Sequence, residues 1–307
     1  MRRAAGGLLL LAVALTGSGC FSSQYRKHPQ IAVVGGDPVV QMKPTDRLPS
    51  LDRPALVSLE RHTSPPAWDE LLIGLTLGSR ARAYPVGLLD SYEVVNDQVD
   101  GFPYVVARCA LTQITALYDR RVAGRTLTFV NSGALWRDTL VLQDRETGTL
   151  WTAATGRALA GPLARERLQA IPARLTTAEA WRTSFPASLY LDTGDLSSVP
   201  LTIRLYDLSS WQGVSGLKTG DRRYKPKEEV FAVRSGEETI AFTAGELSRL
   251  GRVDVTLGGR TVELAWDVAL ASPQAFAGGE LPVTPMYWFA LDRHFDNVRT
   301  LAEATAR

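Results

Sequence analysis

The feature that most constrains the fold is a repeat of one segment at a distance of 158 residues. The segment LIGLTLGSRARAYPVGLL at residues 72–89 aligns without gaps with VFAVRSGEETIAFTAGEL at residues 230–247. The same distance places Gly101 on Gly259. Turn glycines that coincide in this way indicate two related units, because few other residues adopt the backbone conformation of a tight turn. Two unrelated hairpins of a common type are the alternative.

Each copy has the pattern of a β-hairpin, a short helix and a second hairpin. In the first copy, apolar runs flank Gly78-Ser79 and again Asp100-Gly101, which are typical turn sequences. Further strands are expected at residues 116–119, 126–130, 139–143 and 149–152. Short helices are expected at residues 85–91, 177–185, 243–250 and 285–295. The chain is therefore predicted to be mainly β (α+β), with two related β-hairpin–helix–hairpin halves and short peripheral helices.

The first twenty residues, MRRAAGGLLLLAVALTGSGC, have the pattern of an export signal. Arg2 and Arg3 precede the apolar run Leu8–Leu15, which is too short for a transmembrane helix, and small residues then lead to Cys20. A cysteine at this place resembles the lipobox of bacterial lipoproteins, in which the thiol is acylated and becomes the first residue. We therefore expect a membrane anchor at Cys20 and an extracytoplasmic location in the cell envelope. An ordinary signal peptide with an incidental cysteine is the alternative.

The signal and the repeat divide the chain into four parts. Residues 1–19 are the predicted lipoprotein signal peptide. Residues 20–47, which are polar and contain three prolines, are predicted to be a tether or linker. Residues 48–217 form the first β-rich half, and residues 218–307 form a second, shorter, related half.

Charge and the few cysteines and histidines exclude several function classes. Lys and Arg number 34 and Asp and Glu 32, so no basic field predicts a nucleic-acid partner. With Cys20 assigned to the lipid, Cys109 is the remaining thiol, and the three histidines have no ligand spacing. No metal and no cofactor is therefore expected. Arginine outnumbers lysine 29 to 5, which indicates either anion binding by guanidinium groups or a GC-rich genome.

Several short motifs resemble a known family. They are Ile73-Gly74, Ala81-Arg82-Ala83-Tyr84-Pro85, Glu93-Val94-Val95-Asn96-Asp97, Gly101-Phe102-Pro103, Leu127-Thr128-Phe129 and the run from Asp144 to Trp151. In this order they resemble the bacterial domain-of-unknown-function 3179 family, over roughly residues 48–295. The resemblance implies an exported or envelope protein, and it implies no settled activity.

The chain departs from this family at the residues that suggest chemistry. Many members carry a histidine before the equivalent of Glu93 and a C-P-L-C motif. This chain has Tyr92 at the first place and Cys109-Ala110-Leu111-Thr112 at the second. A histidine with two thiolates has the donors of a metal or redox site, and this chain retains one of the two thiols. The site implied for relatives is therefore expected to have decayed here.

The remaining site candidates lie in the first half. Cys109 and Glu93 are the catalytic candidates, because the strand that ends at the thiol is expected beside the turn that carries the carboxylate. The ligand-binding candidates are Tyr84, Tyr92, Asn96, Asp97, Arg108 and Thr112. The alternative is structural, since free cysteines are usually core residues and Asn and Asp commonly stabilise turns.

Together these observations predict a lipid-anchored lipoprotein that acts as a non-catalytic module, binding or assembling with an envelope protein or a small molecule. The first alternative is an envelope enzyme that uses Cys109 with Glu93, and the second is a thiol or metal protein that recruits external ligands. A reactive thiol needs a lowered pKa, usually from a cation or a histidine. On a strand Arg108 points away from Cys109, and no histidine is near in sequence, so an enzymatic role is not expected.

Overall fold

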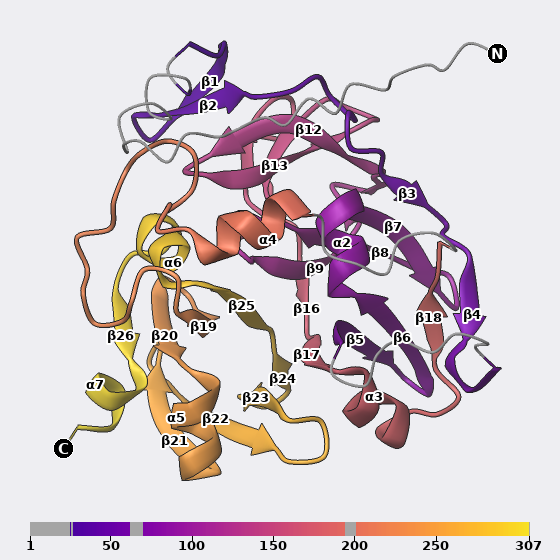
Figure 1. The fold of residues 1–307 in the computed structure, drawn as a ribbon, viewed down its shortest axis with the longest axis vertical. Coiled ribbons are helices and arrows are strands. Elements are labelled where there is room, and N and C mark those ends of the chain that lie inside the picture. Colours follow the sequence, from indigo (N-terminus) through magenta and orange to yellow (C-terminus); the bar gives the residue numbers. More distant parts are fainter. Residues whose placement is uncertain (1–24, 26, 62–69, 194–200, 307) are drawn as a thin grey trace, which may run out of the picture.

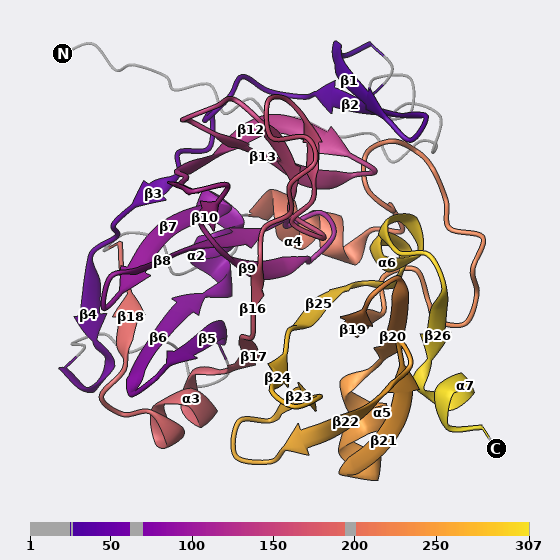
Figure 2. The ribbon, with the colours of Figure 1, turned by 180° about the vertical axis from the view of Figure 1, so that it is seen from behind.

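The computed structural model describes Tyr25 and residues 27–61, 70–193 and 201–306. The predicted lipidation site Cys20 lies outside the described residues, as does His62. Strands predominate, so the prediction of a mainly β fold is confirmed (Figure 1). Two units of similar design lie side by side, and a further sheet packs at one end of the first unit, as the reverse view also shows (Figure 2).

The first unit consists of two five-stranded sheets joined by helix α2 (Val86–Tyr92). One sheet has the order β17 (Arg174–Thr177), β5 (Leu71–Leu77), β6 (Arg80–Pro85), β18 (Leu189–Leu191) and β4 (Leu56–Ser58). The other has the order β16 (Ala170–Ile171), β9 (Thr115–Asp119), β8 (Phe102–Arg108), β7 (Val94–Val99) and β3 (Leu51–Asp52). Both predicted hairpins are present, β5–β6 and β7–β8. Ile73 and Tyr84 from one sheet and Val106 from the other share one core.

The second unit repeats this design with two four-stranded sheets joined by helix α5 (Ala244–Leu250). One sheet has the order β25 (Val283–Tyr287), β19 (Glu229–Ser235), β20 (Glu238–Phe242) and β26 (Val298–Thr300). The other has the order β21 (Arg252–Leu257), β22 (Arg260–Asp267), β23 (Ser272–Phe276) and β24 (Glu280–Leu281). Phe231, Phe242 and Leu264 belong to the core between these sheets.

The two units share strand register as well as strand order. Leu117 pairs with Ile171 where β9 meets β16, and Ala275 pairs with Leu281 at the equivalent place where β23 meets β24. Equivalent residues of the two units are therefore 158 positions apart in the sequence up to β9, and 110 positions apart from β16 onward. The first unit thus has 48 additional residues between β9 and β16, and the repeat predicted from the sequence extends over both sheets.

The additional residues form most of a six-stranded sheet. Its order is β1 (Gln30–Val34), β2 (Asp37–Gln41), β12 (Phe129–Trp136), β13 (Thr139–Asp144), β14 (Leu150–Thr152) and β15 (Ala158–Ala160). The strand expected at residues 126–130 is divided. Its first residue pairs in the small hairpin of β10 (Arg121–Val122) and β11 (Arg125–Thr126), and β12 begins at Phe129.

Part of the segment expected to be a tether is folded. Residues 30–41 form the β1–β2 hairpin, and β2 pairs antiparallel with β12 through Val40 and Leu135. The turn is at Gly35-Gly36, where φ is 60° and 86°, which glycine adopts without a steric penalty. Val39 is fully buried against the additional sheet. A two-glycine turn and burial of valine therefore outweigh the proline content that favoured a linker.

All four predicted helical regions contain a helix. They hold α2, α3 (Ala178–Ser184), α5 and α6 (Trp288–His294). The sequence did not predict α4 (Leu201–Leu208) or α7 (Leu301–Thr305). Reciprocal capping boxes, Thr243 with Glu246 and Thr300 with Glu303, begin α5 and α7. Among the described residues, no helix is long and apolar enough to cross a membrane.

A shared apolar cluster joins the two units. Ile114 and Ala154 come from the first unit and its additional sheet, and they pack in one cluster with Val230, Met286 and Trp288 of the second unit. Met286 and Trp288 are fully buried. Because apolar burial of this kind is a main source of folding free energy, the units are held in contact rather than joined by the chain alone.

Candidate functional site

Cys109 follows the end of β8 and is sealed in the core. Its exposed fraction is 1%, and the backbone N–H of Leu140 in β13 donates to its Sγ at 3.4 Å. Burial and, to a lesser extent, the nearby charge of Glu93 raise the pKa of the thiol to about 11, against a smaller lowering by Thr112. The thiol is therefore protonated at neutral pH and shielded from solvent. The alternative reading of Cys109 as a core residue agrees with this placement.

Glu93 lies close to Cys109, as the sequence predicted. It ends α2 in the left-handed region, with φ of 60°, and the side chain of Asn131 in β12 donates to its carboxylate at 2.5 Å. Burial is the main reason why the pKa of Glu93 is raised to about 7; Asp90 also raises it, and Lys43 and the hydrogen bond from Asn131 partly oppose the rise. Sequence reasoning missed Asn131, because the additional sheet brings it there and no local motif marks it.

Thr112 and His294 complete this neighbourhood without supplying a base. Thr112 is fully buried, and its carbonyl accepts a hydrogen bond from the N–H of Tyr287 at 2.8 Å. Nε2 of His294 in α6 lies 2.7 Å from Oγ1 of Thr139. No hydrogen bond between described residues joins His294 to Cys109. Burial and the neighbouring Arg137 lower the pKa of His294 to about 3, so its ring is neutral at physiological pH.

Arg108 is part of a separate buried ion pair. Its Nε lies 2.5 Å from Oδ1 of Asp90 in α2, and the exposed fractions of the two side chains are 3% and 2%. The same guanidinium donates to Thr115 at 2.9 Å and to Gln113. With these partners, Arg108 clamps α2 to the end of β8. The structure places it away from Cys109, as strand alternation predicted.

Tyr84 and Asp97 form a second buried network, together with Tyr104. The Tyr84 hydroxyl donates to Oδ2 of Asp97 at 2.7 Å, and the Tyr104 hydroxyl donates to the same oxygen at 3.1 Å. Tyr84 and Tyr104 are fully buried, and Asp97 is 5% exposed. This network lies between the two sheets of the first unit, so it stabilises the core.

Asn96 and Tyr92 also have structural roles, Asn96 through hydrogen bonds and Tyr92 through apolar packing. The Asn96 side chain accepts from the N–H of Phe129 at 2.9 Å and donates to its carbonyl at 2.7 Å, which fastens the additional sheet to β7. It also donates to Asp52 at 2.8 Å. Tyr92 is partly buried and packs against the apolar core that contains Leu88. The eight sequence candidates are therefore distributed over several structural networks, and Cys109, Thr112 and Glu93 are the group brought together.

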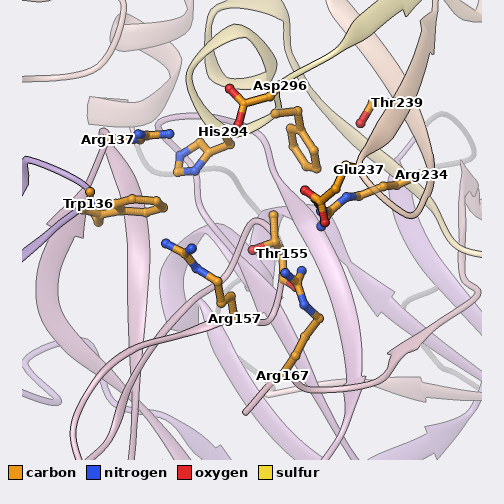
Figure 3. Close-up of a pocket in the computed structure, with 12 residues that line it drawn as sticks. Trp136, Arg137, Thr155, Arg157, Arg167, Arg234, Glu237, Thr239, His294 and Asp296 are labelled. Carbon is orange, nitrogen blue, oxygen red and sulfur yellow. Dashed lines mark hydrogen bonds and ion pairs between the residues drawn. The ribbon is translucent and has the colours of Figure 1, made fainter. Parts of the chain in front are cut away.

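An arginine-rich pocket opens elsewhere, between the additional sheet and the second unit (Figure 3). We call it the arginine pocket, and its volume is about 190 Å³. Its charged lining residues are Arg137, Arg157, Arg167, Arg234, Glu237 and Asp296. With His294 neutral, four arginines against two carboxylates leave a formal charge of +2. The excess of arginine over lysine in the sequence was the signal that pointed to anion binding, and it did not identify these positions.

The described residues offer no evident metal site. No group of three or more His, Cys, Asp or Glu side chains in this part of the chain is arranged to hold a metal ion. The residues around Cys109 provide one thiol, one carboxylate and an amide, and the thiol is protonated.

Comparison with known proteins identifies a family and no closer relative. No curated protein and no solved structure matches the chain. The family model "Protein of unknown function (DUF3179)" matches residues 45–297, which include most of both units and strands β12–β15 of the additional sheet. The resemblance seen in the short motifs of the first unit is therefore confirmed over most of the chain, and this protein belongs to the DUF3179 family.

Proposed function

We propose that this protein is a lipid-anchored, extracytoplasmic binding module without catalytic activity. The observation that carries the proposal is the state of Cys109, which is 1% exposed and has a pKa raised to about 11. The thiolate is the nucleophile and the metal ligand in cysteine chemistry, and this environment suppresses it. An open polar cavity, the arginine pocket, has the character of a binding site rather than a nucleophilic one.

Thiol alkylation tests the absence of cysteine catalysis. The native full-length chain is treated with iodoacetamide at pH 7.5, and the modified peptides are mapped by mass spectrometry. Cys109 is expected to stay unmodified until the protein is denatured. The variant Ser248→Cys, which places a thiol at an exposed position of α5, is the control for reagent activity and is expected to react in the native state. Rapid native labelling of Cys109 would overturn the non-catalytic assignment.

The enzyme alternative has one supporting observation, which is that the carboxylate of Glu93 lies close enough to the Cys109 thiol to influence its pKa. A carboxylate with a pKa of about 7 has the proton affinity of a general base at neutral pH. If Glu93 activated Cys109, alkylation of the native protein would accelerate between pH 6 and 8, and Glu93→Gln would abolish that acceleration. We expect equally slow alkylation in both proteins over this range.

The anchor is tested separately at Cys20. Cells that express the chain are grown with radiolabelled palmitate, and the protein is isolated and fractionated. Labelling and recovery in the membrane fraction are expected for the wild type, and both are expected to be lost in Cys20→Ser. A labelled Cys20→Ser variant, or an unlabelled wild type, would contradict lipidation at this residue.

A further inference from the structure

The arginine pocket contains positive charge that the protein itself does not neutralise. Among the described residues, Arg157 has no ion pair and its side chain makes no hydrogen bond, while its guanidinium lies 5.7 Å from the centre of the Trp136 ring. Arg167 donates to the carbonyl of Thr155 at 3.2 Å and has no carboxylate in ion-pair distance within the same part of the chain. These two guanidinium groups are therefore available to a ligand.

The arginines approach one another from separate parts of the chain. Arg157 precedes β15 in the additional sheet, Arg167 follows that sheet, and Arg234 lies in β19 of the second unit. Figure 3 shows Arg157 extending toward Trp136, and Arg167 extending toward Arg234. Burial lowers the pKa of Arg167, and the charges of Arg234 and Arg157 lower it further. Guanidinium groups that repel one another gain free energy when an anion lies between them.

Buried hydrogen-bond donors without partners line the same pocket. The hydroxyl of Thr239 belongs to a side chain that is 1% exposed, and it has no partner among the described residues. Figure 3 shows the oxygen of Thr239, a residue of β20, among the side chains that line the pocket. Nε1 of Trp136, which is 5% exposed, also has no partner in that part of the structure. Leaving a buried donor unpaired costs about 1–3 kcal/mol, so such groups indicate an acceptor that binds there.

A second cavity with an apolar wall adjoins the arginine pocket. Its volume is about 490 Å³, and it shares Arg167 and Arg234 with the arginine pocket. Its apolar lining residues are Tyr118, Ala154, Leu168, Ala170, Ala232, Leu281, Pro282 and Phe295. A molecule that occupies both cavities therefore meets positive charge at one end and apolar surface at the other.

We propose that the two cavities bind a phosphorylated organic molecule, with its phosphate among Arg157, Arg167 and Arg234 and its apolar body in the adjoining cavity. Three guanidinium groups, a hydroxyl and an indole N–H provide more donors than two carboxylate oxygens accept. A phosphate monoester has three terminal oxygens and a charge between about −1.5 and −2 at pH 7. This charge matches Arg157 and Arg167, the two lining arginines without an ion pair among the described residues, since Arg137 pairs with Asp37 and Arg234 with Glu237. This inference names the ligand class of the binding module and rests on the proposed function for its binding role.

Calorimetric titration of the full chain tests the ligand class. The probes are butyl phosphate, inorganic phosphate and butanol. Butyl phosphate is expected to bind more tightly than inorganic phosphate, and butanol is expected not to bind. Arg157→Gln and Arg167→Gln are each expected to weaken butyl phosphate binding about tenfold, as loss of one charge-assisted contact predicts. Thr239→Val is expected to weaken it a few-fold.

The matched control is Arg252→Gln. This arginine is 70% exposed in β21 and pairs with Glu263, so its loss changes the net charge equally without touching the pocket. Unchanged affinity in Arg252→Gln is expected. Equal weakening in Arg252→Gln and Arg157→Gln, or no binding of either phosphate by the wild type, would overturn the proposal. Binding of inorganic phosphate as tight as that of butyl phosphate would overturn the role of the apolar cavity.

Competition with vesicles distinguishes a lipid headgroup from a free molecule. Phosphatidic acid presents a phosphate monoester on a membrane, and phosphatidylcholine vesicles are the neutral comparison. Displacement of butyl phosphate by phosphatidic acid vesicles alone assigns the phosphate to a lipid, and lack of displacement assigns it to a free molecule. The outcome is independent of Cys109 alkylation and of Cys20 labelling, so a failure of the proposed function is distinguishable from a failure of this inference.

Discussion

The two units of this protein place different chemistry at equivalent buried positions. In the first unit Tyr84, Asp97 and Tyr104 form a hydrogen-bonded network between the sheets. At the same positions of the second unit stand Phe242, Val255 and Val262, which are at most 3% exposed. The backbone pairs in the same register in both units. The fold therefore accepts either a polar or an apolar trio at these positions.

A second pair of positions shows compensation in volume. Gly74 in β5 packs directly beneath the ring of Trp181 in α3, and a Cβ at Gly74 would overlap that ring. At the equivalent positions of the second unit, the strand residue is Ala232 and the helix residue is Leu291, both buried. A larger residue on the helix is thus matched by a smaller residue on the strand. Packing between helix and sheet, rather than residue identity, is what the two units share.

The largest expected effect breaks this volume match. Gly74→Ala is expected to lower the free energy of unfolding by about 3 kcal/mol, because the new methyl group collides with a ring that is enclosed on all sides. Gly74→Ala combined with Trp181→Leu reproduces the pair of the second unit and is expected to recover part of that loss. Urea unfolding of both single variants and the double variant measures the coupling. Strictly additive losses would show that the two positions do not compensate each other.

The next effect concerns the polar trio. Tyr84→Phe removes the 2.7 Å hydrogen bond to the buried Asp97 carboxylate, and we expect a loss of about 2 kcal/mol in the free energy of unfolding. Replacement of all three residues by Phe, Val and Val, as in the second unit, is expected to cost less than Tyr84→Phe alone. Urea unfolding tests both. The control is Phe242→Tyr, which buries a hydroxyl without that carboxylate. A harmless Tyr84→Phe would mean that the network contributes nothing to stability.

The smallest effect is a pH dependence that the second unit lacks, since Gly251 stands at the position equivalent to Glu93. Burial raises the pKa of Glu93 from 4.5 to about 7, so the folded protein binds the proton more tightly than the unfolded chain does. The free energy of unfolding is therefore expected to fall as the pH rises from about 4.5 to about 7, by on the order of 1 kcal/mol because Glu93 is partly exposed.

Unfolding by urea at several pH values measures this contribution. In Glu93→Gln the decrease between pH 4.5 and 7 is expected to be smaller than in the wild type by the same amount, because glutamine does not titrate. Parallel pH profiles for the two proteins would show that Glu93 has an ordinary pKa in the folded state.

The elements with regular apolar patterns were predictable from the sequence. The hairpins of the first unit were marked by the turn residues Gly78-Ser79 and Asp100-Gly101, and the β19–β20 hairpin with α5 by the repeat of residues 72–89 at residues 230–247. Helix α4 was not predicted, since Tyr206 is the one buried residue it contributes and its leucines face outward, with Leu208 87% exposed. A helix with no apolar face toward the core leaves no periodic signal of burial.

The candidate site was predictable only where it is local. Glu93 and Cys109 are joined by one hairpin, so strand pairing alone brings them together. Asn131 reaches Glu93 from the additional sheet, and the arginines of the pocket come from both units. Such contacts depend on how sheets pack, which no short motif encodes. The burial that keeps the Cys109 thiol protonated also depends on the three-dimensional packing and has no sequence motif.

The β1–β2 hairpin limits how far the protein could move from a membrane. If Cys20 is acylated, ten residues lead from the lipid to the first strand, and at about 3.5 Å per residue they reach at most about 35 Å. Gly35 at the tip of this hairpin lines the arginine pocket, and Asp37 pairs with Arg137 at its rim. The pocket would then lie on the same side of the molecule as the lipid anchor, where ligands from the bilayer surface could reach it.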